Sequence, residues 1–296
     1  MALDIVQVSD IHLSPTHAWF QDNWDVFVDE MHANPPDFVF VTGDVCVNGP
    51  DRDWEFAFAR QQLGRLPVRW RAIPGNHDAG DTPPDERNNH PLTEPLRATF
   101  HRHIDADWWA EDLANWRFIG LNAQLIDSGL PSEPQQWAFL EQALADAGDR
   151  RLAIWVHKPL FVREPTDQGR HLTALFPEGR ARLLALCARH GVALVGSGHL
   201  HRFRRQKIGA TRLVWAPATA FLMGGRKLPG AARLGYMRYR FARAGFTARL
   251  VEPPLFLNLD VRNWNRFRGS TIHLPERALR QGGADGPAVT SCRSNR

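Results

Sequence analysis

Cysteine is scarce in this chain: there are 3 among its 296 residues, Cys46, Cys187 and Cys292. They lie far apart and show no Cys-x-x-Cys spacing, which argues against both a disulfide framework and a thiolate zinc site. Cys46 and Cys187 sit in apolar stretches, where a free cysteine typically serves as a small core residue. This cysteine usage indicates a reduced setting, and we expect a cytoplasmic protein.

Long apolar runs are missing as well. No stretch approaches the roughly 20 apolar residues that a membrane-spanning helix needs. The first residues lead almost at once into the apolar segment 3–8, which leaves no room for the basic and apolar regions of a signal peptide. We therefore expect neither a signal peptide nor a membrane partner.

Lysine occurs only three times, as Lys158, Lys207 and Lys227, so arginine carries most of the positive charge. The formal net charge is +4 and the sequence pI is about 9.3. No dense block of basic residues runs through the chain, although binding to nucleic acid generally needs a concentrated basic face. Nucleic acid is therefore not the expected partner.

Two catalytic signatures are absent. The sequence contains no Gly-x-Ser-x-Gly elbow of the serine hydrolases and no Gly-x-x-x-x-Gly-Lys phosphate loop. We therefore expect neither a serine nucleophile nor nucleotide binding of the P-loop type.

The chain does contain a regular alternation of apolar strands and amphipathic helices, which predicts βαβ units and a mainly parallel sheet. Near the C-terminal end, adjacent strands joined by short turns replace this alternation and predict an antiparallel set of strands. Residues 79–115 interrupt the alternation of strands and helices. We interpret the interruption as a long loop that forms a wall of the active site. The predicted strands are 3–8, 38–41, 67–73, 117–122, 151–156, 192–195, 211–216 and those within 235–251, and the predicted helices are 24–32, 51–63, 134–147 and 178–189.

Five of the predicted strands end in residues that can bind metal or move protons. These residues are Asp10 and His12, Asp44, the run Asn76-His77-Asp78, His157, and His199 with His201. Ligands of open α/β sheets bind at the carboxyl ends of the strands, so we expect these side chains to converge. Any one of them alone could belong to an ordinary polar loop, but five strand ends with the same chemistry predict a functional site.

The chemistry of this set predicts a metal centre. Imidazole, carboxylate and amide ligands without thiolate suit Zn, Mn or Fe, and the candidate groups are too many for one tetrahedral ion but suit two. Two ions about 3.5–4 Å apart can bridge a water, lower its pKa and clamp an in-line displacement at phosphorus. Because Asp10-x-His12 and His199-x-His201 alternate, both side chains of each pair would face the same way in an extended segment.

In this order, the motifs Asp-x-His, Gly-Asp, Gly-Asn-His-Asp, a lone His after a strand, and Gly-His-x-His resemble those of the calcineurin-like metallophosphoesterases. The resemblance covers roughly residues 3–202, and Ser-Asp-Ile-His-Leu at 9–13 looks most like the class III cyclic-nucleotide phosphodiesterase branch. It implies an α/β fold, a four-layer αββα sandwich of two mixed β-sheets flanked by helices. The sequence lacks periodicity from about residue 262 onward, so we expect a catalytic domain over 1–262 and a partly flexible C-terminal extension over 263–296, with 281–296 as a flexible tail.

The resemblance further assigns roles to residues. One metal would take Asp10, His12, Asp44 and His201, and the other would take Asp44, Asn76, His157 and His199, so that Asp44 bridges the two. His77 would face the phosphate as the catalytic residue that stabilises charge or protonates the leaving oxygen. The nucleophile would be a hydroxide that bridges the metals.

Two departures from the family pattern matter. Val47 stands where many members have an acidic residue that supports the catalytic histidine, and Asn48 and Asp78 are the candidates for taking over that support. Lys158 follows His157 where the cyclic-nucleotide branch often has a second histidine, which weakens the assignment to that branch. Arg202 is a candidate contact to the substrate phosphate, although a place on a solvated surface strand is the plainer interpretation.

The leading hypothesis is a binuclear metal-dependent phosphodiesterase that acts on a cyclic nucleotide or another small phosphodiester. A phosphomonoesterase or a nuclease of the same superfamily is the alternative enzyme, and a non-catalytic scaffold with this fold is the alternative from another class. A degraded scaffold loses ligands, whereas none of the eight positions assigned above is lost. A homodimer is left open.

Overall fold

Two β-sheets lie face to face at the centre of the computed structural model, which describes residues 2–83, 90–223 and 227–260 and the short strands at 267–268 and 271–272. The first sheet has the strand order β11-β10-β1-β2-β3. Its strands β1, β2 and β3 are parallel, whereas β10 runs antiparallel to both β1 and β11. The bounds are β1 Leu3–Val8, β2 Phe38–Thr42, β3 Trp70–Ile73, β10 Tyr236–Ala242 and β11 Gly245–Val251.

The second sheet has the strand order β4-β5-β6-β7-β9-β8. Its four inner strands are parallel, and the edge strands β4 and β8 are antiparallel to their neighbours. Both sheets are therefore mixed, as the family resemblance implied. The bounds are β4 Trp109–Leu113, β5 Trp116–Leu121, β6 Arg151–Val156, β7 Leu194–Ser197, β8 Arg204–Ile208 and β9 Thr211–Trp215.

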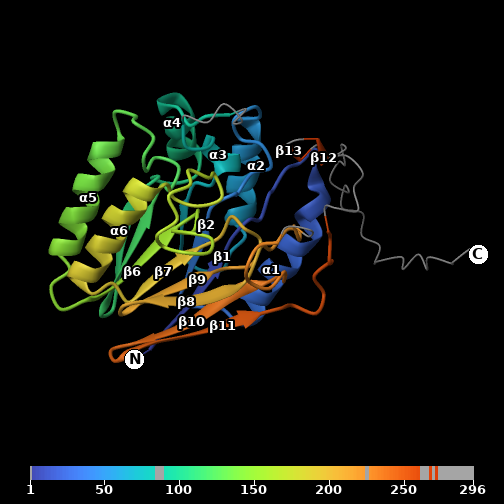
Figure 1. Cartoon of the computed structure of the whole chain (residues 1–296). Coiled ribbons are helices and arrows are strands. Elements are labelled where there is room, and N and C mark those ends of the chain that lie inside the picture. Colours follow the sequence, from blue (N-terminus) through green and yellow to red (C-terminus); the bar gives the residue numbers. More distant parts are fainter. Residues whose placement is uncertain (1, 84–89, 224–226, 261–266, 269–270, 273–296) are drawn as a thin grey trace, which may run out of the picture.

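Helices cover the outer face of each sheet (Figure 1). One apolar cluster joins α1, α2 and α4 to the first sheet, and another joins α5 and α6 to the second. The result is the predicted four-layer αββα sandwich. The helices are α1 Gln21–Ala33, α2 Trp54–Leu63, α4 Glu94–His103, α5 Glu133–Ala145 and α6 Pro177–His190, with the short η1 Ala18–Phe20 and α3 Asn76–Ala79.

The layer between the two sheets is rich in aromatic side chains. Phe40 of the first sheet stacks on Trp109 of the second with ring centroids 5.3 Å apart, and it also contacts Trp155. The indole nitrogen of Trp109 donates to the carbonyl of Ala72 across the layer. Burial of such rings is worth roughly 25 cal/mol per Å² of apolar surface. This packing fixes the two sheets, and hence their strand ends, relative to each other.

The segment 79–115 is not the single long loop that we expected, because it contains α4 and β4. Within α4, Phe100 is the only fully buried residue, so the apolar periodicity that reveals a helix is weak. Its signals are local: the Thr93 side chain caps the helix by accepting from the Leu96 N–H, and Pro95 lies in the first turn. Strand β4 forms a hairpin with β5 and brings Trp109 into the core.

A smaller correction concerns the Asn76-His77-Asp78 run, which is a single helical turn, α3, rather than an open loop. The predicted domain of 1–262 stays a prediction. Apart from the strands β12 Phe267–Arg268 and β13 Thr271–Ile272, the predicted extension over 263–296 lies outside the described residues. Within the described part, none of the helices combines the length and the apolar character required to cross a membrane.

Candidate metal centre

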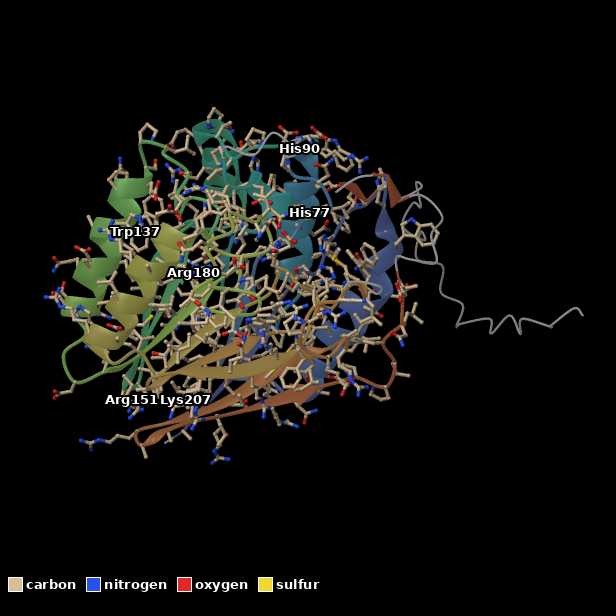
Figure 2. The ribbon with its side chains drawn as sticks, viewed as in Figure 1. His77, His90, Trp137, Arg151, Arg180 and Lys207 are labelled. Atoms are coloured by element: carbon tan, nitrogen blue, oxygen red, sulfur yellow. The ribbon has the colours of Figure 1, made fainter. Side chains whose placement is uncertain are left out.

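The strand ends singled out in the sequence meet at one end of the sandwich. We expected these strand ends at one edge of a single sheet. Instead β1, β2 and β3 belong to the first sheet, whereas β6 and β7 belong to the second. In Figure 2 His77 lies toward the top of the view and Arg151, the first residue of β6, lies at the bottom. The site therefore lies across the junction of the two sheets, at the carboxyl ends of five parallel strands.

Two groups of side chains converge there, each close enough to hold one metal ion. The potential ligand atoms within each group lie within 4.8 Å of one another. We call them the first cluster, formed by Asp10, His12, Asp44 and His201, and the second cluster, formed by Asp44, His157 and His199.

Asp44 belongs to both clusters. Its Oδ2 lies 3.7 Å from Nε2 of His12 and 3.3 Å from Nε2 of His157. In the first cluster, Nε2 of His201 lies 3.3 Å from Oδ1 of Asp10. In the second, Nδ1 of His199 lies 3.2 Å from Nε2 of His157. One carboxylate thus stands between two sets of imidazoles, which is the arrangement a bridging ligand requires.

Asn76 lies in α3, directly after β3. Its Oδ1 atom is buried and has no hydrogen-bond partner among the described residues. A buried amide oxygen without a partner carries a free-energy cost of a few kcal/mol, so such an atom calls for an explanation. Coordination of a metal ion would satisfy it, and metal chemistry accepts an amide oxygen in this role.

The clusters are built on unusual backbone. Seven described residues other than glycine have a positive φ, and five of them are Asp10, His12, Asp44, His199 and His201. Each such conformation costs on the order of 1–3 kcal/mol and collects at functional sites. This finding corrects our argument from alternating spacing: Asp10 and His12 reach the same cluster from left-handed turns, not from an extended strand.

Backbone carbonyls hold the outer nitrogen of several imidazoles. His157 donates from Nδ1 to the carbonyl of Thr42 at 2.8 Å, and His201 donates from Nδ1 to that of Phe221 at 2.7 Å. His199 is turned the other way, with Nε2 3.0 Å from the carbonyl of Leu172 and Nδ1 toward His157. Such contacts fix the tautomer and leave one nitrogen free for a metal. No sequence signal could have identified these carbonyls, because every residue has one.

The charges of the second cluster are coupled through Asp44. Burial opposes ionisation of that carboxyl group, but the neighbouring His157 and His77 hold its pKa well below the usual range. Burial also disfavours the imidazolium of His157, yet Asp44 raises the pKa of His157 to about 9. Burial and the positive charge of His157 lower the pKa of His199 well below its usual value. The second cluster thus combines a carboxylate whose pKa is lowered, Asp44, with one imidazole whose pKa is raised, His157, and one whose pKa is lowered, His199.

His77 lies beside the first cluster, with its ring 4.7 Å from that of His12 between centroids. Its Nδ1 lies 2.7 Å from the carbonyl oxygen of Val47, and its backbone N–H donates to Oδ1 of Asp44 at 2.9 Å. The main chain at Val47 therefore supports the His77 ring. The two candidates named from the sequence, Asn48 and Asp78, make other contacts.

Asn48 and Asp78 have other tasks. The Asn48 side chain donates to Asp51. The Asp78 carboxylate is fully buried and accepts from the backbone N–H groups of Val45, Cys46 and Gly75, so it shapes the turn that carries Asp44. Burial and the nearby Asp44 raise the pKa of Asp78 to about 7, against the effect of those three donors. Both residues are structural in this arrangement.

Arg202 follows His201 but is almost buried, and its Nη1 donates to the carbonyl of Gly230 at 2.9 Å. The plainer interpretation, a surface strand, applies to the residues after it, since Arg204 and Arg205 lie on β8. Sequence reasoning noted Lys158 only as a departure from a pattern. The structure places it inside, 1% exposed and beside the site.

Comparison with known proteins identifies the family. Residues 3–203 match the calcineurin-like phosphoesterase family. The chain belongs to that family. Membership confirms the predicted enzyme class, a metal-dependent phosphoester hydrolase.

Two curated relatives are glycerophosphodiester phosphodiesterases by name. GpdQ of Enterobacter lignolyticus is 30% identical over 192 residues, which are 62% of this chain and 63% of that protein. The probable GpdQ of Arcobacter nitrofigilis is 27% identical over 292 residues, 91% of each. A third relative is the human serine/threonine-protein phosphatase CPPED1, 29% identical over 181 residues, which are 57% of this chain and 55% of that protein.

Solved structures share the fold at low sequence identity. A purple acid phosphatase from yellow lupin superposes with a TM-score of 0.57 at 14% identity, covering 84% of this chain and 52% of that one. A dimetal phosphatase from Danio rerio gives a TM-score of 0.54 at 12% identity, covering 84% and 98%. These likenesses support the αββα architecture and nothing finer.

Proposed function

We propose that the two clusters bind two metal ions and that the chain hydrolyses a small phosphodiester. The observation that carries this proposal is the position of Asp44, whose single carboxylate belongs to both clusters. The ligands fit the ions: His157, His199 and His201 each have one nitrogen engaged with a carbonyl and the other turned inward, and Asn76 offers an orphaned buried oxygen to the second cluster. Oxygen and nitrogen donors without thiolate favour Mn, Fe or Zn.

When bound, two such ions activate a water molecule and neutralise the charge of the phosphate. The remaining tasks belong to the protein. Because a carbonyl oxygen can only accept, the contact with Val47 places a hydrogen on Nδ1 of His77 and leaves Nε2 to exchange a proton with the substrate. As the water oxygen bonds to phosphorus and the bond to the alcohol breaks, a protonated His77 gives its Nε2 proton to the departing oxygen.

Among phosphodiesters, we favour those with a small alcohol such as glycerol. The names of two relatives point to glycerophosphodiesters, and one of them aligns over nine-tenths of this chain. Cyclic nucleotides, the first expectation from the sequence, remain the second candidate. Arg202 is a weak candidate for the phosphate contact, because its guanidinium is already held by Gly230.

A hydrolysis panel with metal analysis of the same sample tests the proposal. The purified chain is stripped with a chelator, reloaded with Mn²⁺, and assayed on glycerophosphoethanolamine, cyclic AMP, bis(p-nitrophenyl) phosphate and p-nitrophenyl phosphate. We expect two ions per chain and faster turnover of the diesters than of the monoester. Two bound ions with no hydrolysis of any substrate would favour the scaffold, and fewer than two ions would exclude the binuclear mechanism.

A phosphomonoesterase is the second candidate function, because the human relative is named a serine/threonine-protein phosphatase. The same panel separates the two. A phosphomonoesterase would turn over p-nitrophenyl phosphate, or a phosphoserine peptide added to the panel, faster than any diester.

A further inference from the structure

Lys158, the residue after His157, carries the ammonium group that lies buried beside the second cluster. Its side chain is 1% exposed. The ammonium donates to Oγ1 of Thr82 at 2.9 Å and forms an ion pair with the carboxylate of Asp81. A buried ammonium is very costly unless it is paired and hydrogen-bonded, so both partners are needed to keep it there.

Both partners come from the segment that follows α3. Asp81 and Thr82 are themselves nearly buried. The Asp81 backbone is held in turn, since its N–H donates to the carbonyl of His90 and its carbonyl accepts from the N–H of Leu92. The ammonium therefore attaches the end of β6, in the second sheet, to an anchored segment next to α3, at the edge of the first sheet.

This connection bears more directly on the second cluster than on the first. The second cluster takes His157 from the end of β6, and Asn76, its proposed amide ligand, from α3. Lys158 joins the end of β6 to the segment directly after α3. The first cluster takes its ligands from the ends of β1, β2 and β7, and His157 and α3 contact it through the shared Asp44.

We propose that Lys158 is a positioning residue for the second metal ion: its contacts with Asp81 and Thr82 set the separation of His157 and Asn76. The inference rests on the proposed binuclear function. In this proposal Lys158 does not touch the ion, but it orients the residues that bind the ion. Removal of the link should weaken the second ion selectively and leave the first unchanged.

The test must separate loss of the link from the damage of an unpaired charge. Lys158→Met alone would strand the buried carboxylate of Asp81, so the main variant is the double substitution Lys158→Met with Asp81→Leu, which removes both charges. Thr82→Val is the mild variant, because it removes only the hydroxyl acceptor and nearly keeps the shape. The control is Arg238→Met, which breaks the ion pair with Asp4 near the start of β1, remote from Asp10 at its other end.

The measurement is titration of the chelator-stripped full chain with Mn²⁺ by calorimetry, followed by electron paramagnetic resonance to distinguish isolated from paired ions. We expect the double variant to bind the first ion with wild-type affinity and the second about 10–100-fold more weakly, the range typical of lost outer supports. Thr82→Val should shift the second ion in the same direction by less, and Arg238→Met should shift neither.

Three results would overturn the inference. Wild-type affinity for both ions in the double variant and in Thr82→Val would show that the link is not needed. Equal weakening of both ions would show a general structural effect. Fewer than two ions in the unaltered chain would remove the proposed function and this inference together, a result that the wild-type titration alone identifies.

Discussion

The Nδ1 atom of His77 donates a hydrogen bond to the backbone carbonyl oxygen of Val47 at 2.7 Å. A position at which the family often provides an acidic side chain thus supports the histidine through its main chain. A carbonyl fixes the tautomer and ring orientation as a carboxylate would, but it adds no negative charge to stabilise an imidazolium.

The first prediction follows from that main-chain contact. Val47→Ala keeps the carbonyl, so we expect kcat to stay close to the wild-type value. The side chain packs with Phe20 and Phe221, and its loss should lower the free energy of unfolding by about 1–3 kcal/mol. Steady-state kinetics and denaturant unfolding measure the two effects. A large fall in kcat with unchanged metal content would mean that the valine side chain, and not the carbonyl, matters to His77.

The second prediction concerns the proton of His77. In His77→Gln we expect both metal ions to remain and kcat to fall by about 10²–10⁴, the usual contribution of a general acid. The loss should depend on the leaving group. It should be large for an alkyl alcohol, which must be protonated as it departs, and small for p-nitrophenol, which leaves as a stable anion. Equal losses on both substrates would show that His77 is not the acid, and loss of metal would show that it is a ligand.

The third prediction concerns the shared carboxylate. Asp44→Ala should bind neither ion tightly and should have no measurable activity, because one group serves both clusters. His157→Ala should lose mainly the second ion, and His201→Ala mainly the first. Elemental analysis after gel filtration gives the counts, and circular dichroism checks the fold. Retention of one ion in Asp44→Ala would show that the clusters are independent and that no bridge exists.

The sequence could predict the residues that act through their side chains, but not the contacts that the main chain makes. Asp10, Asp44, His157 and His199 were found because a run of apolar residues reveals where a strand ends, and ligands collect there. The supports at Thr42, Phe221 and Leu172 are carbonyls, which residue type does not encode. The positive φ values of the ligands could not be located from the sequence either: Asp and His adopt such values more often than most residues, but tertiary contacts determine at which positions they do so.

The same reasoning explains the elements that were missed. Helix α4 buries little, so its apolar periodicity is faint, and β4 is an edge strand whose alternating pattern spans five residues. Lys158 appeared only as a departure from the family pattern, at a position where the cyclic-nucleotide branch often has a second histidine. Its meaning depends on Asp81 and Thr82, which are more than 70 residues away in sequence. Pairings across such distances are set by topology, which local patterns do not determine.

The last prediction returns to the turn before Asn76. A Cβ added at Gly75 would overlap Oδ1 of Asp44 and lie 2.8 Å from its Cγ, with the rigid backbone of Asp44 also in the way. Gly75→Ala should therefore displace the shared carboxylate and weaken binding of both ions, although the backbone of Gly75 itself is unstrained.

Gly64→Ala, at the end of α2, is the matched control because its added Cβ would come no closer than 3.3 Å to a neighbour. Both variants are titrated with Mn²⁺ beside the wild type. If Gly75→Ala bound two ions as tightly as Gly64→Ala, the position of Asp44 would be less restricted than its contacts with Gly75 imply. The proposed bridge would then lose its main geometric support.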